Sequence, residues 1–442
     1  MSKRSYLLPF VAVTTLFFLW GFVTVLVDAL VPRLKEVFDL SFAKAGVIQF
    51  AWFIAYFLFS IPGGWIISKL GYKKGIIMGL SLIGSGALLF YPAADYRVYG
   101  LFLLALFVVA SGITMLQVAA NPYIAVLGPK EGASSRLNLA QAFNSLGTTI
   151  APILAVVFLL SDDILTAAEI QKLSEADKAA YFLAEAGTVQ QLFLLIAVFV
   201  AFLAIVFALV KLPKIMEDRP STGVFAGYSA ALKFPILRWG IAAIFVYVGA
   251  EVAIGSFLTS YFIDLGLVET ITNVGPLREV VTFISETFTG KQFEELDQKG
   301  IVGSFVFFYW FSAMVGRFIG AYLTKVFKPS KVLSIFGFGA IALILISISS
   351  SGLTAMFSIL AVGLFNSIMF PTIFSLSIDQ LGDYKAEGSG LLCTAIVGGA
   401  VIPALTGFLI DFKGFSLAFG ILTVFYFVIV LFGRKAMKTL SN

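Results

Sequence analysis

The sequence predicts an all-α membrane protein with twelve transmembrane helices arranged in two halves of six. The first observation is composition, because 60% of the residues are hydrophobic and only 12% are charged, against about 25% charged in a soluble domain. The second is that apolar runs of about 20 residues recur along the chain, without the alternation of a barrel. The third is a set of landmarks that repeats roughly 250 residues later.

We expect the twelve spans at residues 8–32, 44–68, 74–94, 98–127, 135–160, 188–211, 238–263, 301–325, 331–350, 352–378, 387–411 and 414–433. With the N-terminus inside, the inner segments hold nineteen Lys and Arg residues and the outer segments hold ten. Because basic loop residues stay in the cytoplasm, this bias predicts that both termini are cytoplasmic. The two long outer loops, 161–189 and 265–300, are acidic, and their periodicity predicts short surface helices.

An internal repeat defines the halves. Three landmarks recur at offsets of 256, 249 and 251 residues, and they pair Gly64 with Gly320, Gln117 with Asn366, and Gly147 with Gly398. The first landmark is a glycine before a basic loop, and each of the other two stands five residues before a proline. Recurrence in the same order indicates duplication. We therefore expect an N-terminal six-helix bundle at 1–212, a cytoplasmic linker at 213–237 and a C-terminal six-helix bundle at 238–442.

Residue content excludes several functional classes. The chain has no histidine and one cysteine, Cys393, which rules out a Ser/His/Asp triad and an internal disulfide and leaves no zinc or iron site. It also lacks the glycine-rich phosphate loop of an ATP-driven protein. The net charge of +5 is spread over short loops, which argues against a nucleic-acid site. We therefore expect no enzyme and no cofactor, but a secondary transporter driven by a proton or sodium gradient.

Two carboxylates lie within predicted spans and are candidates for proton or cation coupling. Asp28 is about twenty residues into the first span. Glu251 follows Arg238 by thirteen residues, which places it about 20 Å deep at a helical rise of 1.5 Å per residue. Ionisable residues at such depth are usually functional, and Glu251 is also a candidate for substrate binding. The alternatives are an interfacial carboxylate near Arg33 for the first and a buried ion pair with Arg317 for the second.

Uncharged polar side chains interrupt the apolar spans in the stretch 111–152 and its counterpart in the second half: Gln117, Asn121, Asn138, Gln141, Asn144 and Asn366. The first two are four residues apart and share one helix face, and the next three follow at intervals of three. An amide offers both a donor and an acceptor, so facing helices with amides can bracket a polyhydroxylated ligand. The alternative is that the amides join helices, at about 0.6 kcal/mol per contact.

Aromatic side chains near these amides can stack on the face of a sugar. The candidates are Trp20, Tyr247 and Phe370. Packing is the alternative reading, because aromatic residues make up 15% of the chain. Arg317 follows a glycine in the eighth span, and we expect it to anchor the cytoplasmic half of that span.

Four segments resemble the fucose permease family of the major facilitator superfamily, namely residues 20–32, 117–123, 136–147 and 370–376. The runs Ala-Ala-Asn-Pro and Arg-Leu-Asn-Leu-Ala-Gln, within the second and third segments, carry the most specific part of the resemblance. The similarity covers nearly the whole chain outside the two long outer loops. It implies the two-half major facilitator fold and uptake of a monosaccharide by cation symport across a bacterial inner membrane.

Within this resemblance, Asp28 matches the aspartate that fucose permeases use for proton coupling and sugar binding. Two positions depart from the pattern: Gln117 stands where fucose permeases have a glutamate, and Glu251 stands where they have a residue similar to glutamine. This exchange resembles the glucose/galactose branch of the family. Because a glutamine does not titrate, the resemblance implies that Asp28 carries the coupling proton, alone or with Glu251.

We therefore predict a multi-pass, monomeric protein of the bacterial inner membrane that carries a glucose-, galactose- or fucose-like hexose with a proton by alternating access. Its expected partners are the sugar and the lipid bilayer. Sodium coupling stays open as an alternative. An efflux antiporter for amphipathic compounds is a further alternative, but it would need a mostly aromatic cavity.

Overall fold

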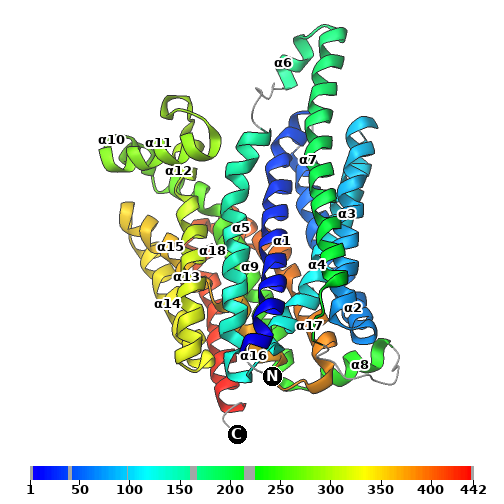
Figure 1. Cartoon of the computed structure of the whole chain (residues 1–442). Coiled ribbons are helices and arrows are strands. Elements are labelled where there is room, and N and C mark those ends of the chain that lie inside the picture. The colour runs from blue at the N-terminus through cyan, green and yellow to red at the C-terminus, as the bar shows by residue number, and fades with distance from the viewer. Residues whose placement is uncertain (1–2, 38–41, 97, 160–166, 214–223, 440–442) are drawn as a thin grey trace.

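The computed structural model describes residues 3–37, 42–96, 98–159, 167–213 and 224–439, and the side chains of residues 28–37 and 42–49 are among those that remain outside this description. The described chain consists of helices and connecting turns, without a strand. The helices run roughly along one axis of the molecule, and both termini lie at the same end (Figure 1). We call this the terminal end.

Six long helices form the N-terminal bundle: α1 (Lys3–Val37), α2 (Phe42–Leu70), α3 (Tyr72–Tyr96), α4 (Tyr99–Val126), α5 (Ala133–Leu159) and α7 (Glu175–Leu209). Within it α3 packs against α4 and α7, α2 packs against α4, and α1 packs against α5. The short helix α6 (Ala167–Lys172) precedes α7 at the end opposite the termini (Figure 1).

The C-terminal bundle is built from α9 (Pro235–Asp264), α13 (Val306–Val326), α14 (Pro329–Ser349), α15 (Gly352–Asn366), α16 (Met369–Ile378), α17 (Lys385–Thr394), η4 (Ala395–Val397) and α18 (Gly398–Thr439). Two of its six spans are interrupted: α15 and α16 share one, and α17, η4 and the start of α18 share another. The helical geometry of α18 breaks at Gly414, where φ is +78°, a backbone conformation that glycine adopts without strain. The break separates the last two spans.

The described helices are consistent with the twelve predicted spans. Ten described segments are long and apolar enough to cross a membrane, and the last of them, Gly382–Thr439, contains both spans that meet at Gly414. Helix α5 supplies the twelfth. One boundary differs clearly, because α7 begins at Glu175 and not near 188. The Ser174 side chain caps this helix by accepting from the Asp177 amide, so the helix extends beyond its apolar part.

In the first outer loop α6 is short as expected, but residues 175–189 belong to the long helix α7. The short surface helices expected in the second outer loop are present. They are α10 (Leu267–Asn273), α11 (Gly275–Thr289), η2 (Phe293–Glu295) and α12 (Gln298–Gly303), and they cover the C-terminal bundle at the end opposite the termini (Figure 1). An ion pair of 2.9 Å between Arg278 and Glu294 joins α11 to η2. Among the described residues of the linker, α8 (Val224–Ala231) forms a helix at the terminal end.

Helices α1 and α5 approach closely because two glycines lie between them. A Cβ atom on Gly147 would collide with the Phe18 carbonyl, and one on Gly21 would collide with the Asn144 carbonyl. Small residues allow such backbone contact in membranes. The contact lets the Asn144 side chain donate to the Phe17 carbonyl at 2.9 Å, which fixes its position beside the centre of the molecule.

Replacing Gly147 with alanine is expected to destabilise the protein by about 1–3 kcal/mol, because the added methyl group meets backbone atoms that cannot rotate away. The measurement is the thermal unfolding midpoint in detergent. Gly84→Ala in α3 is the matched control, since a Cβ there meets open space and alanine favours a helix by up to about 1 kcal/mol. Equal midpoints for the two variants would contradict the close-contact interpretation.

Candidate functional site

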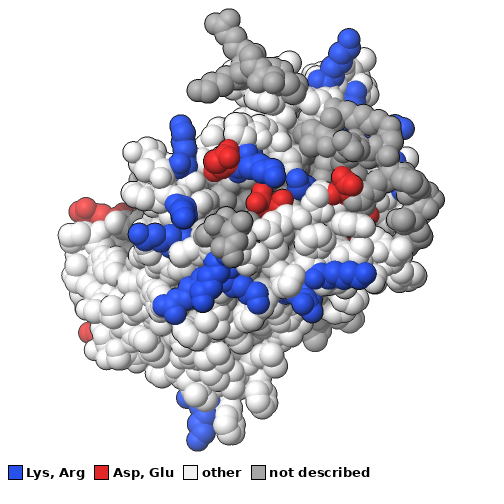
Figure 2. All heavy atoms as spheres, turned by 90° about the horizontal axis from the view of Figure 1, so that it is seen from below, with Lys and Arg blue, Asp and Glu red and all other residues white. Residues whose placement is uncertain are grey.

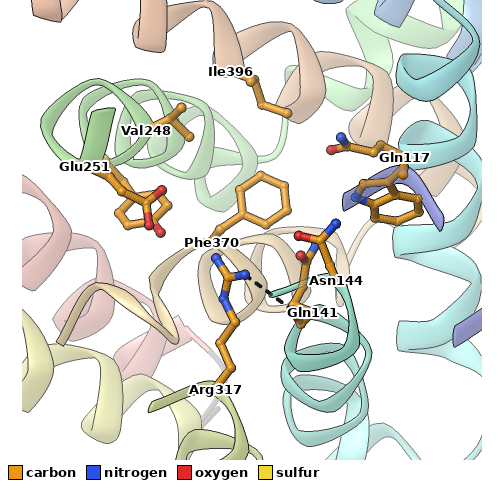
Figure 3. A pocket seen from close by; sticks show the side chains of 10 residues that line it. Gln117, Gln141, Asn144, Val248, Glu251, Arg317, Phe370 and Ile396 are labelled. Atoms are coloured by element: carbon orange, nitrogen blue, oxygen red, sulfur yellow. Dashed lines mark hydrogen bonds between the residues drawn. The ribbon is translucent and has the colours of Figure 1, made fainter. Parts of the chain in front are cut away.

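A cavity of about 160 Å³ lies between the two bundles. From the N-terminal bundle it is lined by Trp20, Gln117, Gln141 and Asn144, and from the C-terminal bundle by Tyr247, Val248, Glu251, Arg317, Phe370 and Ile396 (Figure 3). The lining residues come from seven elements: α1, α4, α5, α9, α13, α16 and η4. The cavity is therefore formed only when both bundles meet.

The N-terminal wall presents amide oxygens to the cavity. The Gln117 Nε2 donates to the Tyr56 hydroxyl at 2.7 Å, and the Gln141 Nε2 donates to Asn121 Oδ1 at 3.5 Å. The Asn144 amide donates to α1, as described above. Among the hydrogen bonds of the described residues, none uses the side-chain oxygens of these three lining amides. Their nitrogen atoms are thus held by the bundle, and their oxygen atoms are available as acceptors.

The C-terminal wall carries polar atoms that lack partners within the described chain. Glu251 Oε1 and the Tyr247 hydroxyl are both buried from solvent and lie near each other, but neither meets the geometry of a hydrogen bond within the described chain. The Glu251 backbone carbonyl accepts from the Tyr309 hydroxyl at 3.1 Å, and that hydroxyl accepts from Asn366 Nδ2 at 2.8 Å. A buried polar atom without a partner is costly. The wall is therefore suited to a ligand that supplies hydroxyl groups.

Arg317 connects the two walls. Its Nη1 donates to the Ser145 hydroxyl and to the Gln141 carbonyl, the latter at 3.3 Å, both on α5. Its Nε donates to the Ser367 carbonyl at 3.3 Å within its own bundle. The expected anchor thus also lines the cavity (Figure 3). Glu251 and Arg317 share the cavity, but within the described residues they form no ion pair closer than 4 Å.

Apolar side chains complete the cavity. Trp20 is 4% exposed and packs against Phe17 with ring centroids 4.1 Å apart. Phe370 projects into the space between Glu251 and Gln117 (Figure 3). The remaining apolar lining comes from Val248 and Ile396. Flat apolar surfaces of this kind suit the C–H face of a sugar ring, while the amides suit its edge.

Below the cavity, toward the terminal end, hydrogen bonds close the seam between the bundles. Asn138 is fully buried and donates to Ser134 within α5 at 2.8 Å and across the seam to Thr372 at 3.2 Å. The hydroxyls of Ser134 and Ser375 are 2.6 Å apart, and Ser135 donates to a carbonyl of α13 at 2.6 Å. These contacts therefore join α5 to α13 and α16 at the terminal end.

The linker and α17 add to this closure. Tyr228 of α8 donates to the Ile61 carbonyl of α2, and Ser389 of α17 donates to the Val118 carbonyl of α4 at 2.8 Å. Cys393 of α17 is fully buried and lies beside Asn121 of α4. On the other side of the cavity, the described cross-bundle hydrogen bonds are limited to the weak contact of Thr149 with Met314 at 3.5 Å. The terminal end is therefore the more tightly closed one.

Comparison with known proteins identifies the family. The sequence profile of the Major Facilitator Superfamily matches residues 10–392. The chain belongs to this superfamily. A glucose/galactose transporter of Brucella abortus biovar 1 (strain 9-941) is 43% identical over 99% of this chain and 96% of its own length. An L-fucose-proton symporter of Escherichia coli (strain K12) is 35% identical over 100% of this chain and 96% of its own length.

A solved structure carries the same fold. The crystal structure of a major facilitator superfamily transporter, FucP, in the outward conformation matches with a TM-score of 0.84 at 33% identity, covering 98% of this chain and 99% of that one. The resemblance to the fucose permease family, on its glucose/galactose branch, is confirmed by these relatives. Both named relatives are transporters, in agreement with the prediction that this superfamily member is not an enzyme.

The major facilitator fold brings together seven of the eleven predicted site residues: Trp20, Gln117, Gln141, Asn144, Tyr247, Glu251 and Phe370. Three others, Asn121, Asn138 and Asn366, are fully buried and contact neighbouring helices without lining the cavity. The eleventh, Asp28, belongs to α1, but its side chain lies outside the described residues. Three further lining residues, Arg317, Val248 and Ile396, were not predicted as site residues. Of these, only Arg317 stands out in the sequence, because it carries a charge within a predicted span.

Asn138→Ala is expected to loosen the terminal end, because it removes the hydrogen bond to Thr372 across the seam. Losing this hydrogen bond destabilises the closed state by about 1 kcal/mol. The population that is open at the terminal end then rises about fivefold. Cys393 reports this opening, since its thiol is buried beside the opposite bundle. The measurement is the rate at which N-ethylmaleimide labels the purified protein, with Cys393→Ser as the background.

Thr148→Ala is the matched control for this labelling experiment. Its hydroxyl donates to the Ser145 carbonyl inside the same helix at 2.8 Å, so its loss leaves the seam intact. If both variants are labelled at the wild-type rate, Asn138 does not hold the terminal end closed.

Proposed function

We propose that this major facilitator superfamily member is a secondary active hexose:proton symporter that works by alternating access. The observation that carries the proposal is the cavity between the bundles, where amide oxygens on one side face a carboxylate on the other. The names of its relatives, a glucose/galactose transporter and an L-fucose-proton symporter, support a sugar substrate and proton coupling. They give no support to sodium coupling.

Sugar recognition rests on the division between polar and apolar lining. Hydroxyl groups of the sugar donate to the side-chain oxygens of Gln117, Gln141 and Asn144, and to Glu251. The ring stacks on Trp20, with Tyr247 and Phe370 on the other side. Asn121, Asn138 and Asn366 act as supports that orient the residues in contact with the sugar. An efflux antiporter has less support, because half of the lining residues are polar.

The coupling proton binds to Asp28 in this proposal, with Glu251 as the second titratable group of the pathway. Both residues lie in helices that cross the membrane, where carboxylates are usually functional. Glu251 Oε1 lacks a partner within the described chain. A sugar hydroxyl that binds there, or a proton that neutralises the carboxylate, removes the same cost of burial. The sugar and the proton therefore act on the same carboxylate in this proposal.

The seam supports alternating access, because hydrogen bonds between the bundles can break while each bundle stays folded. The moving units are residues 1–212 and 238–442, joined by the linker 213–237, and no cofactor takes part. With both termini in the cytoplasm of a bacterium, the closed terminal end faces inward and the structure is in an outward-facing state. The excess of Lys and Arg in the inner loops supports this orientation, and the related FucP structure in the outward conformation supports this state. The chain acts as a monomer, since each copy contains a whole cavity.

Purified protein in proteoliposomes is expected to exchange labelled D-glucose or D-galactose in counterflow, and to accumulate the sugar when the outside is more acidic than the inside. Replacing sodium by potassium should leave both rates unchanged. A panel that includes L-fucose and an amphipathic drug tests the substrate class. Exchange of the drug without exchange of any hexose would overturn the proposal.

Asp28→Asn is expected to abolish accumulation driven by a pH gradient, because an amide cannot take up and release the proton. Counterflow, which needs only sugar binding and movement of the bundles, should remain measurable. Asp264→Asn is the matched control, since Asp264 is an exposed carboxylate at the end of α9. Full pH-driven accumulation by a well-expressed Asp28→Asn protein would exclude the coupling role.

A further inference from the structure

A second cavity, separate from the sugar cavity, lies where α9 begins and α18 ends. It has a volume of about 450 Å³ and is lined by Pro235, Arg238, Trp239, Ala242 and Lys435. None of these residues lines the sugar cavity. Helix α9 starts at Pro235 and α18 ends at Thr439, one turn after Lys435. The cavity is therefore at the level where the spans leave the hydrocarbon and meet the polar membrane interface.

Two positive charges in this cavity lack a negative partner within the described chain. Arg238 is exposed and Lys435 is half-buried, and neither makes an ion pair with a described acidic residue. The Lys435 ammonium group lies 5.1 Å from the centre of the Trp239 ring, which holds it toward the cavity. Figure 2 shows many Lys and Arg side chains on this end of the molecule and few acidic ones. The charge of the cavity therefore favours an anionic ligand.

The surroundings indicate that the anion carries apolar chains. Trp239 stands one turn into α9, and tryptophan favours the depth of the lipid head groups. On α18, Leu431 and Phe427 precede Lys435 at intervals of four, so the three share one helix face. Phe427 is 45% exposed. An apolar surface thus extends from the basic cavity toward the middle of the membrane. A soluble phosphate compound would leave this surface uncovered.

We propose that this cavity binds the head group of an anionic phospholipid, with its phosphodiester between Arg238 and Lys435 and its acyl chains along Phe427. A guanidinium group matches two phosphate oxygens at once, and lysine adds a second charge. Basic pockets between membrane helices are suited to anionic head groups for the same reasons. The lipid would join the first and last helices of the C-terminal bundle beside the linker.

Tryptophan quenching by brominated lipids tests this assignment in the full-length protein. The protein is reconstituted in vesicles that contain either phosphatidylglycerol or phosphatidylcholine brominated on the acyl chains, at equal mole fractions. The fluorescence of Trp239 is obtained as the emission of the wild type minus that of the Trp239→Phe variant. Brominated phosphatidylglycerol is expected to quench this signal severalfold more. Each of Arg238→Gln and Lys435→Gln should lower the preference about fivefold.

Lys325→Gln with Lys328→Gln is the matched control, because both lysines are exposed at the terminal end and lie outside this cavity. It should keep the full preference for phosphatidylglycerol. The charge-preserving change Lys435→Arg should keep it as well, which separates loss of charge from a folding defect.

Three results would overturn the proposal. The first is equal quenching of the Trp239 signal by the two lipids. The second is an unchanged preference in the variant that carries both Arg238→Gln and Lys435→Gln. The third is loss of the preference when glycerol 3-phosphate or inorganic phosphate is added to the solution, because this would identify a soluble phosphate compound as the ligand.

Discussion

The structure depends on one constraint: inside the membrane, a polar group finds its partners in the protein or remains without one. Water cannot satisfy amides placed in hydrocarbon, so each amide of α4 and α5 must face another helix or an internal cavity. The sequence places most of them on two adjacent spans, and the structure turns those spans toward the C-terminal bundle. The seam between the bundles is polar because no lipid-facing surface would accept these residues.

Along this seam the same residue types do two different things. Near the terminal end, Asn138 donates to Thr372 and the hydroxyls of Ser134 and Ser375 share a hydrogen bond, both across the bundles. One to two turns further along α5, Gln141 and Asn144 use their nitrogen atoms within the protein and keep their oxygen atoms for the cavity. Closure therefore relies on hydrogen bonds that water can replace when the bundles separate, whereas the apolar core of each bundle stays intact.

The duplication of the halves does not extend to their chemistry. Gln117 and Asn366 occupy equivalent positions in the repeat, but Gln117 lines the cavity and Asn366 is fully buried against Tyr309. In the C-terminal bundle, Glu251 and Arg317 line the cavity instead. Neither residue belongs to a landmark of the repeat. The site is thus asymmetric, with amides on one side and charges on the other. In the proposed mechanism, the amides are fixed acceptors for the sugar, and Glu251 adds a titratable group opposite them.

The sequence by itself determined the spans, the duplication, the surface helices and the family, because apolar length, residue spacing and short motifs are local properties of the chain. It also determined which residue types are too polar for lipid. Tertiary structure alone decided which of them face the cavity. Asn121 is four residues from Gln117 yet does not line the cavity, and Arg317 reaches across the seam to Ser145. These positions depend on how each helix is rotated and how the bundles meet, and no spacing along one helix fixes either.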